Sequence, residues 1–220
     1  MIVLKNLKVF FYSILDLILP PRSDFEIVQK LNEDDILALP QATTVPKMDW
    51  VHPLFLYKDF RVKAIIWELK YRENTSPLKY ISKILYEEII ALISDILLFQ
   101  SDAEFLLVPI PISVNRRRER GYNQSEYMAR AIREHDTEQI LLYAPQWLEK
   151  IKETERQSHS QSKQERMKNL VGCFKADSRV EGKCIILIDD VVTTGSTLSE
   201  ARSTLFSAGA KDVFAFTIAH

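Results

Sequence analysis

Glycine is scarce in this chain, with five residues among 220. A dinucleotide-binding fingerprint requires three closely spaced glycines, and a Walker A loop requires two glycines at a fixed spacing before Lys-Ser/Thr. The five glycines lie at positions 121, 172, 182, 195 and 209 and match neither pattern. We therefore interpret each of them as marking a forced turn.

Cysteine is also rare, and the charges almost cancel. Cys173 and Cys184 are the only cysteines, which excludes a disulfide framework and a four-ligand zinc site. We interpret both as reduced core thiols, a pattern that suits the cytoplasm. Because 29 lysines and arginines are balanced by 30 acidic residues, the net charge of −1 gives no global attraction to nucleic acid or to an anionic membrane. Any basic site must be local.

The apolar stretch near the amino terminus, Val9 to Leu19, is too short to span a bilayer. Asp16 interrupts it, and Pro20-Pro21-Arg22 stands where a signal peptide would carry a small-residue cleavage site. These features favour an amphipathic docking helix over a secretion signal, and no membrane span is expected.

The length of 220 residues suffices for one substantial α/β domain with a small appendage. Residues 20–53 are rich in proline and acidic side chains and show weak periodicity, which indicates a loosely structured lobe or linker. We divide the chain into a helical and irregular appendage, residues 1–54, and an α/β domain, residues 55–220.

Hydrophobic periodicity predicts several elements in the middle of the chain. The expected helices start at Phe60, run from about Leu78 to Phe99 and from about Ser125 to Glu134, and include a short one at Glu165 to Leu170. A continuous apolar run, Phe105 to Val108, predicts a buried strand that is stopped by Pro109-Ile110-Pro111.

The carboxyl-terminal segment gives the clearest pattern. The expected order is a strand at Cys184 to Ile188, a loop at Asp189 to Thr197, a helix at Leu198 to Ser207 that ends near Gly209, and a strand at Val213 to Ile218. This β-loop-α-β unit predicts a sheet that is at least partly parallel.

The segment Ile185 to Thr197 places two carboxylates at a strand end and a hydroxyl-rich turn before a helix. A helix start has unpaired N–H groups and partial positive charge, so it suits a phosphate dianion. Gly195 would let the backbone fold closely around that phosphate. Further neutral donors would come from the hydroxyls of Thr193, Thr194, Ser196 and Thr197.

The same phosphate would repel Asp189 and Asp190, so we expect these side chains to accept hydrogen bonds from ribose hydroxyls instead. They could also hold hydrated Mg²⁺, which takes oxygen ligands and keeps several waters. A phosphoaspartate hydrolase would need Asp-x-Asp rather than adjacent aspartates. A capped helix after an ordinary strand would explain Ser196 or Thr197 but not the paired acids.

These residues resemble the phosphoribosyl pyrophosphate (PRPP) signature of type I phosphoribosyltransferases, in which a hydrophobic strand and two acids precede Thr-Thr-Gly-x-Thr. The resemblance implies the α/β fold of that superfamily, a Rossmann-like, mainly parallel sheet flanked by helices. It also implies that Asp189 and Asp190 are the catalytic acids and Mg²⁺ sites, and that residues 193–197 bind the 5′-phosphate.

The arginine run that ends in Arg120-Gly121-Tyr122-Asn123-Gln124 is similar to that of the ComF family, with Tyr122 in place of phenylalanine. Leu69-Lys70-Tyr71 resembles an early element of that family, and a later series runs from Gln157-Ser158 to Phe174. Guanidiniums suit pyrophosphate because they form bidentate bonds with its oxygens, although a solvated charge run is an alternative. The pyrophosphate-binding residues expected from this reading are Pro111, Arg116, Arg117, Arg118, Arg120 and Lys70.

Two other segments bear on this resemblance. ComF proteins commonly carry an amino-terminal zinc ribbon, but Leu19-Pro20-Pro21-Arg22 leads to Ser23 without any Cys-x-x-Cys, so no zinc is expected. The polar stretch Lys152 to Lys163 suits a mobile lid over the anomeric carbon, and an ordinary surface loop is the alternative. The candidate lid residues are Arg156, His159 and Lys163.

The resemblance implies a phosphoribosyltransferase that uses PRPP or a nucleoside monophosphate, with a nucleobase or amine as acceptor. One alternative is a non-catalytic sensor or assembly point in DNA uptake that meets a protein of the competence machinery. Another is binding of single-stranded DNA through Arg116 to Arg120, with Tyr122 stacking on a base. An oligomer is compatible with each alternative.

Overall fold

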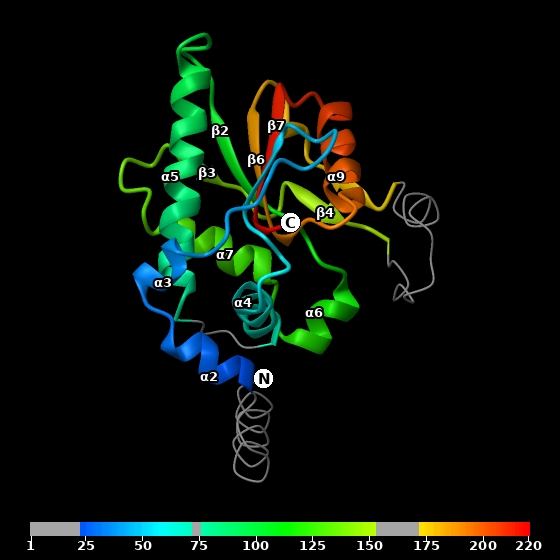
Figure 1. Cartoon of the computed structure of the whole chain (residues 1–220). Coiled ribbons are helices and arrows are strands. Elements are labelled where there is room, and N and C mark those ends of the chain that lie inside the picture. Colours follow the sequence, from blue (N-terminus) through cyan, green and yellow to red (C-terminus); the bar gives the residue numbers. More distant parts are fainter. Residues whose placement is uncertain (1–22, 72–75, 153–171) are drawn as a thin grey trace.

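A parallel sheet forms the centre of the protein (Figure 1). This computed structural model describes residues 23–71, 76–152 and 172–220. The predicted helices at Val9 to Leu19 and Glu165 to Leu170 lie outside the described residues. So do the candidate lid residues Arg156, His159 and Lys163.

The sheet has five strands in the order β1-β7-β6-β2-β3, and every neighbouring pair is parallel. Its central strands are apolar runs that are buried on both faces, as expected for a parallel sheet. The strands are β1 (Val51–Phe55), β2 (Phe105–Pro109), β3 (Leu141–Tyr143), β6 (Cys184–Val191) and β7 (Asp212–Ala219).

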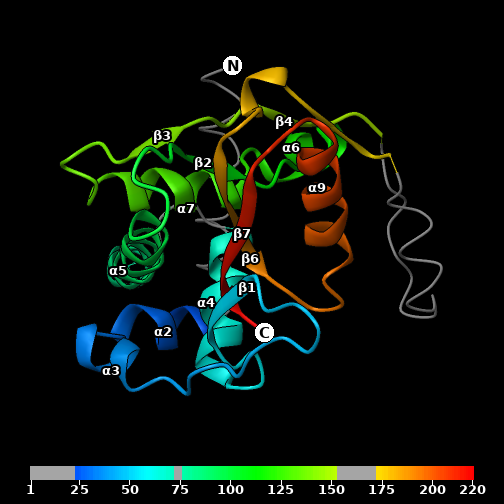
Figure 2. The same cartoon turned by 90° about the horizontal axis from the view of Figure 1, so that it is seen from above.

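Helices cover both faces of the sheet (Figures 1 and 2). On one face α5 (Leu78–Leu97) and α7 (Gln124–Arg133) pack on Ile186 and Ile188. On the other face α9 (Ser196–Ser207) packs on Ile185 and Leu187. This second layer also contains the antiparallel pair of β4 (Leu148–Lys150) and β5 (Phe174–Ala176).

Further helices complete the described structure. They are α2 (Ser23–Lys30), α3 (Glu33–Leu37), α4 (Phe60–Tyr71), α6 (Val114–Arg120) and the 3₁₀ turn η1 (Ser178–Val180). Within the described ranges, no helix is both long enough and apolar enough to cross a bilayer.

The predicted fold class is confirmed, because a mainly parallel sheet is flanked by helices. The carboxyl-terminal β-loop-α-β unit is also confirmed, since β6 and β7 pair in parallel from Cys184↔Asp212 to Val191↔Ala219. Both cysteines are buried and form no disulfide, and burial raises the pKa of each thiol.

The amino-terminal lobe is more ordered than its sequence suggests. Val51–Phe55 is an edge strand that pairs with β7, although Pro53 lies in its middle. Proline is tolerated on an edge strand because one side of that strand lacks a ladder partner. The main core also includes Val28 and Ile36 from α2 and α3. The sequence boundary between residues 54 and 55 therefore falls inside a strand of the sheet.

Candidate functional site

The signature residues, 185–197, lie where the order of the strands in the sheet reverses. From β2 the chain leads to β3 on one side, and from β6 it leads to β7 on the other. In an α/β sheet, the crevice outside the carboxyl ends of two such strands is the usual ligand site. In Figure 1 the strands β6 and β7 run toward α4, α6 and the first turn of α7.

The two aspartates belong to the strand and not to the predicted loop. β6 continues to Val191 because its backbone keeps pairing with β7, through Asp189↔Thr217 and Val191↔Ala219. This corrects the expected loop boundary at Asp189. The sheet therefore fixes the backbone of both acids.

Asp190 is nearly buried, with 6% of its surface exposed. The Lys70 ammonium lies 3.2 Å from Asp190 Oδ2, and the Gln124 side-chain amide donates to the same oxygen at 3.4 Å. Lys70 thus compensates a charge that would otherwise be costly to bury. The structure brings the predicted pyrophosphate residue Lys70 to the predicted ribose residue Asp190.

Asp189 has only neutral hydrogen-bond partners among the described residues. Ser125 Oγ donates to Asp189 Oδ1 at 3.0 Å, and the Asp190 N–H donates to the same atom at 2.9 Å. Burial of the carboxyl, followed by the negative charge of Asp190, raises the pKa of Asp189 to about 7. A cation or further donors near Asp189 would stabilise its ionised form.

The first turn of α7 supplies contacts that the sequence analysis did not assign. Asn123 caps α7 by accepting from the Ser125 N–H at 3.0 Å, and its amide donates to the Ile110 carbonyl at 3.0 Å. Gln124 is 5% exposed, and its Oε1 has no hydrogen-bond partner among the described residues. The asparagine before the helix is a capping signal that could have located this turn.

The turn after β6 ends at Gly195, which is the N-cap of α9. Its φ of 73° lies in the left-handed region that favours glycine. The hydroxyls of Thr194 and Ser196 lie 2.9 Å apart, and the Ser196 N–H donates to Thr194 Oγ1 at 3.4 Å. Ser196 and Thr197 are therefore the first helical residues, so α9 starts earlier than the predicted Leu198.

A segment from the amino-terminal half lies against this turn. A Cβ added at Gly195 would be 2.6 Å from Met48 Cε and closer still to Met48 Sδ. Met48 is 9% exposed and belongs to the core cluster beneath α9. The absence of a side chain at Gly195 therefore makes room for Met48, while the turn itself keeps Thr193 exposed.

The arginine run lies on helix α6. Ser113 caps this helix, and Gly121, with φ of 88°, ends it in the left-handed conformation. No residue of α6 is buried; Arg117 forms an ion pair with Glu126, and the Arg120 guanidinium lies 5.8 Å from the Tyr71 ring centre. The described contacts to the aspartates thus come from α4 and α7 and not from α6.

The loop after β2 is held against the end of β6. The Ile110 N–H donates to the Ile188 carbonyl at 2.9 Å, and half-buried Pro111 follows directly. The hydroxyl of Tyr122, the residue that the DNA-binding alternative assigns to base stacking, donates its hydrogen to the Leu69 carbonyl at 2.5 Å. Its ring also meets Tyr127 edge-on at 6.3 Å, so Tyr122 serves the packing between α4 and α7.

The site fits a hydrated magnesium ion by its donor chemistry. Asp189 and Asp190 offer carboxylate oxygens, and Gln124 adds a buried acceptor oxygen that has no hydrogen-bond partner in residues 23–71, 76–152 and 172–220. Within the described ranges, no group of three or more His, Cys, Asp or Glu side chains forms a metal-binding cluster. Two carboxylates suit Mg²⁺, which usually keeps several of its waters.

Two surface hollows are described near these elements. One of about 550 Å³ lies over the outer face of α9 and includes Lys47, Trp50 and Arg202. The other, of about 440 Å³, lies along α4 and includes Tyr57, Trp67 and Lys70. Residues 193–197 line neither hollow. Lys70 lines the second hollow and also forms the ion pair with Asp190.

Comparison with known proteins identifies relatives of this chain, although no protein-family model matches it. A segment of 116 residues is 34% identical to competence protein ComFC of Streptococcus pneumoniae and covers 52% of this chain and 48% of that protein. A segment of 120 residues is 35% identical to competence protein ComFC of Bacillus subtilis and covers 53% of this chain and 45% of that protein. This chain is thus similar to the ComFC competence proteins over about half of its length.

A longer match links the chain to a protein with a different name. Over 174 residues it is 25% identical to the DNA utilization protein YhgH of Salmonella typhimurium, with 79% of this chain and 70% of that protein covered. The chain spans about half the length of the two ComFC proteins that it matches. The names of these relatives refer to competence and to DNA utilization.

Proposed function

We propose that this protein binds PRPP, or a nucleoside 5′-phosphate, at the carboxyl end of β6 and acts in competence or DNA uptake. One observation carries the proposal. The paired acids at the end of a buried strand lie directly before the left-handed turn at Gly195, which opens α9. A sugar phosphate offers hydroxyl donors to the acids and an anion to the helix start.

The phosphate end would be held by backbone and hydroxyl donors. The first N–H groups of α9 have no partner within the helix, and the helix dipole favours an anion at this end. The exposed Thr193 hydroxyl and the paired hydroxyls of Thr194 and Ser196 lie at the same turn, and Thr197 follows on α9. These donors bind a phosphate dianion without needing a lysine.

The ribose end would meet the acids. Asp189 would accept from ribose hydroxyls, and the buried Gln124 Oε1 offers a further acceptor. Asp190 and Asp189 would hold Mg²⁺ through water, and the bound ion would supply positive charge to the pyrophosphate. Lys70 already balances Asp190, and its flexible side chain can turn toward pyrophosphate when the charge of Asp190 is otherwise compensated.

Catalysis in such a site would be positional and electrostatic. The strand and the helix starts are fixed before the ligand arrives, so binding would order few residues of the site. Arg116, Arg118 and Arg120 on α6 are the remaining cations proposed for pyrophosphate. A protein that binds PRPP without releasing pyrophosphate would instead use the site as a sensor.

Calorimetric titration with PRPP, with and without Mg²⁺, tests the proposal. We expect Mg²⁺-dependent binding, and replacing both acids, Asp189→Asn with Asp190→Asn, should weaken it at least about tenfold because the ribose and Mg²⁺ contacts are lost. The matched control is Asp102→Asn, which changes an exposed carboxylate in the turn before β2. Unchanged affinity in the double variant would refute the assignment.

Pyrophosphate release across a panel of nucleobases then separates transfer from sensing. Release with one class of acceptor indicates a transferase, whereas binding without release indicates a sensor of phosphoribosyl compounds. Both outcomes leave the binding site as proposed.

A second candidate function is binding of single-stranded DNA. It is favoured by the arginines of α6, none of which is buried, and by Tyr71, which is 55% exposed and whose ring centre lies 5.8 Å from the Arg120 guanidinium. Bases stack on exposed aromatic rings, and arginines contact the backbone. When protein is added to a labelled oligonucleotide, the rise in anisotropy should be much smaller for the double variant Arg116→Gln with Arg118→Gln than for the unaltered protein if this function holds. The two proteins should behave alike if α6 serves pyrophosphate alone.

A further inference from the structure

The hollow of about 440 Å³ along α4 lies beside the proposed phosphoribosyl site. Its size falls in the usual range of about 300–1,000 Å³ for small-molecule pockets. Six of its lining residues matter here: Tyr57, Lys63, Ile66, Trp67, Lys70 and Tyr71. Lys63, Ile66, Trp67 and Lys70 recur at helical spacing, so they form one face of α4.

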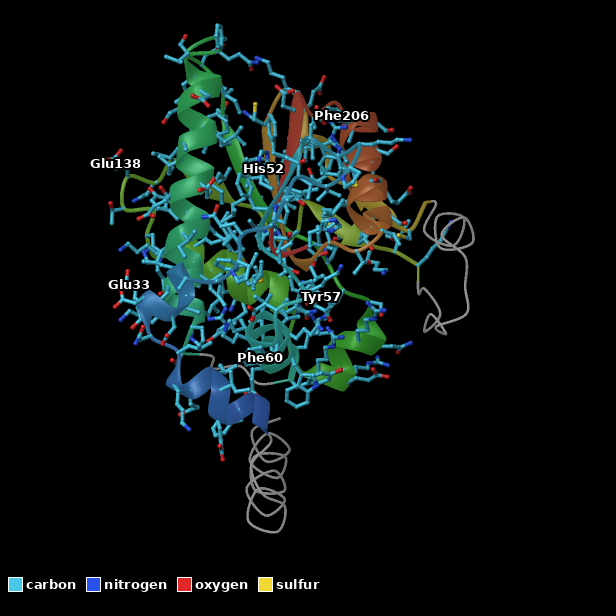
Figure 3. The ribbon with its side chains drawn as sticks, viewed as in Figure 1. Glu33, His52, Tyr57, Phe60, Glu138 and Phe206 are labelled. Atoms are coloured by element: carbon cyan, nitrogen blue, oxygen red, sulfur yellow. The ribbon has the colours of Figure 1, made fainter. Side chains whose placement is uncertain are left out.

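Two sets of contacts link residues that line this hollow to the signature residues 185–197. Lys70 lines the hollow and lies 3.2 Å from Asp190. The Tyr57 N–H donates to the His220 carbonyl at 2.8 Å, and the His220 ring Nδ1 lies 3.1 Å from the Val192 carbonyl. The hollow therefore adjoins both the acids and the start of the turn. Figure 3 labels Tyr57 and, lower in the view, Phe60, which is the first residue of α4.

The lining combines flat aromatic surfaces with Lys63, which forms an ion pair with no carboxylate in the described part of the chain. The Trp67 and Tyr71 rings lie 4.9 Å apart, and the Tyr57 ring is 38% exposed. The Lys63 ammonium lies 6.0 Å from the centre of the Tyr57 ring, and no described carboxylate pairs with it. Lys70 is already balanced by Asp190. The charge that remains for a ligand is thus that of Lys63.

We propose that this hollow receives the acceptor of the phosphoribosyl group, and that the acceptor is a planar aromatic compound carrying a carboxylate. The ring would lie against Trp67 and Tyr57, and the carboxylate would face Lys63. The inference rests on the proposed function, because the acceptor role requires a phosphoribosyl donor at Asp189 and Asp190. Aromatic stacking supplies affinity, and the charge-assisted contact with Lys63 supplies selectivity.

The transfer itself balances without any oxidant or reductant. A ring nitrogen of the acceptor supplies the electron pair of the new bond to the anomeric carbon. The bond from that carbon to the pyrophosphate oxygen breaks, and its electron pair leaves with pyrophosphate. Where the nitrogen carries a proton, that proton passes to the departing pyrophosphate.

Two matched pairs of planar probes test the inference: orotate with uracil, and nicotinate with nicotinamide. Each pair differs chiefly in a ring carboxylate. With PRPP and Mg²⁺ present, calorimetry should show each acid binding at least about tenfold more tightly than its neutral partner, as expected for one charge-assisted contact. Quenching of tryptophan fluorescence should accompany binding and should be lost in Trp67→Leu.

Lys63→Gln should remove the preference for the acids, because the cation that faces the carboxylate is gone. Lys58→Gln is the matched control, since Lys58 is an exposed lysine of the same region that does not line the hollow. Its preference for the acids should be unchanged. Equal preference in Lys63→Gln and in the unaltered protein would overturn the assignment.

The remaining outcomes separate this inference from the proposed function. If PRPP does not bind, the proposed function fails and the acceptor role fails with it. If PRPP binds but no planar acid does, only the present inference is overturned. If Lys63→Gln and Trp67→Leu weaken the binding of an oligothymidine strand while the acids do not bind, the hollow serves nucleic acid, which also overturns it.

Discussion

Two adjacent aspartates on one strand have different electrostatic surroundings. Asp190 has the Lys70 ammonium at 3.2 Å, whereas Asp189 has the Ser125 hydroxyl at 3.0 Å and one backbone amide. Lys70 therefore forms an ion pair with Asp190, whereas no cation among the described residues forms one with Asp189. Because the pKa of Asp189 is raised by burial, this acid gains more than Asp190 from a nearby cation or from hydroxyl donors.

His52 on β1 makes folding stability sensitive to pH. Its ring stacks on Phe216 at 4.8 Å, and its Nε2 is buried without a hydrogen-bond partner among the described residues. Burial lowers the pKa of His52 below its ordinary value of 6.5, and the weaker influences of Glu88 and Asp49 oppose this shift. The folded state therefore favours the neutral ring.

We predict that the stability contributed by the neutral His52 ring is fully present above the pKa that His52 has in the unfolded chain. This stability is lost as the pH falls through the lower pKa of the folded state, because the unfolded chain binds the proton more tightly than the folded protein does. His52→Phe keeps a stacking ring that does not titrate. Urea denaturation should show a smaller loss of unfolding free energy between pH 7.5 and pH 5.5 in the variant than in the unaltered protein. Parallel pH profiles would show that His52 contributes nothing.

At the scale of elements, the sequence predicted the long helices and central strands well. The α5 span, the β2 run and the β6-α9-β7 unit all have strong patterns, and their predicted bounds differ from the structure by only a few residues. β6 is longer than predicted because its extension depends on pairing with β7 and not on apolar side chains. Local pattern cannot show where a partner strand ends.

The contacts of the site were harder to predict. Ser125 and Asp189 are separated by 64 positions, and Gln124 and Asp190 by 66. Such pairs meet only because α7 packs on β6, so a single sequence identifies the acids but not the groups that hold them. The three-residue strand β3 was missed for a related reason, since it is too short to show a period of two.

The start of α7 links stability to binding through Asn123. Asn123→Ala removes the cap and the bond to the Ile110 carbonyl, so we expect a loss of about 2 kcal/mol of unfolding free energy, from about 1 kcal/mol for the cap and a similar amount for the buried bond. PRPP affinity should also fall, because Gln124 and Ser125 follow directly. Chemical denaturation and calorimetry measure the two effects.

Asn32→Ala is the matched control for this change. Asn32 caps α3 by accepting from the Asp35 N–H at 2.9 Å, but it is exposed and lies on a different helix. It should lower stability by about 1 kcal/mol or less and leave PRPP affinity unchanged. An Asn123→Ala protein that binds PRPP normally would show that the α7 cap does not position the site.

In the whole molecule, the amino-terminal half of the chain completes the carboxyl-terminal motif. β1 pairs with β7, the Tyr57 N–H donates to the last residue, His220, and Met48 lies against Gly195. The turn proposed to hold phosphate is thus packed on one side by a segment about 150 positions earlier in sequence. A substitution at Met48 should therefore alter the stability effect of a substitution at Gly195.

A double-mutant cycle tests this coupling. Gly195→Ala should cost about 1–2 kcal/mol for its left-handed backbone and more for the clash with Met48. Gly182→Ala, with φ of 71° and no atom within 4 Å of the added Cβ, should cost only the backbone part. In a Met48→Ala background, Gly195→Ala should cost about as much as Gly182→Ala in urea denaturation, because the clashing side chain is absent. The same cost in both backgrounds would mean that Met48 moves aside freely and that the two segments are not coupled.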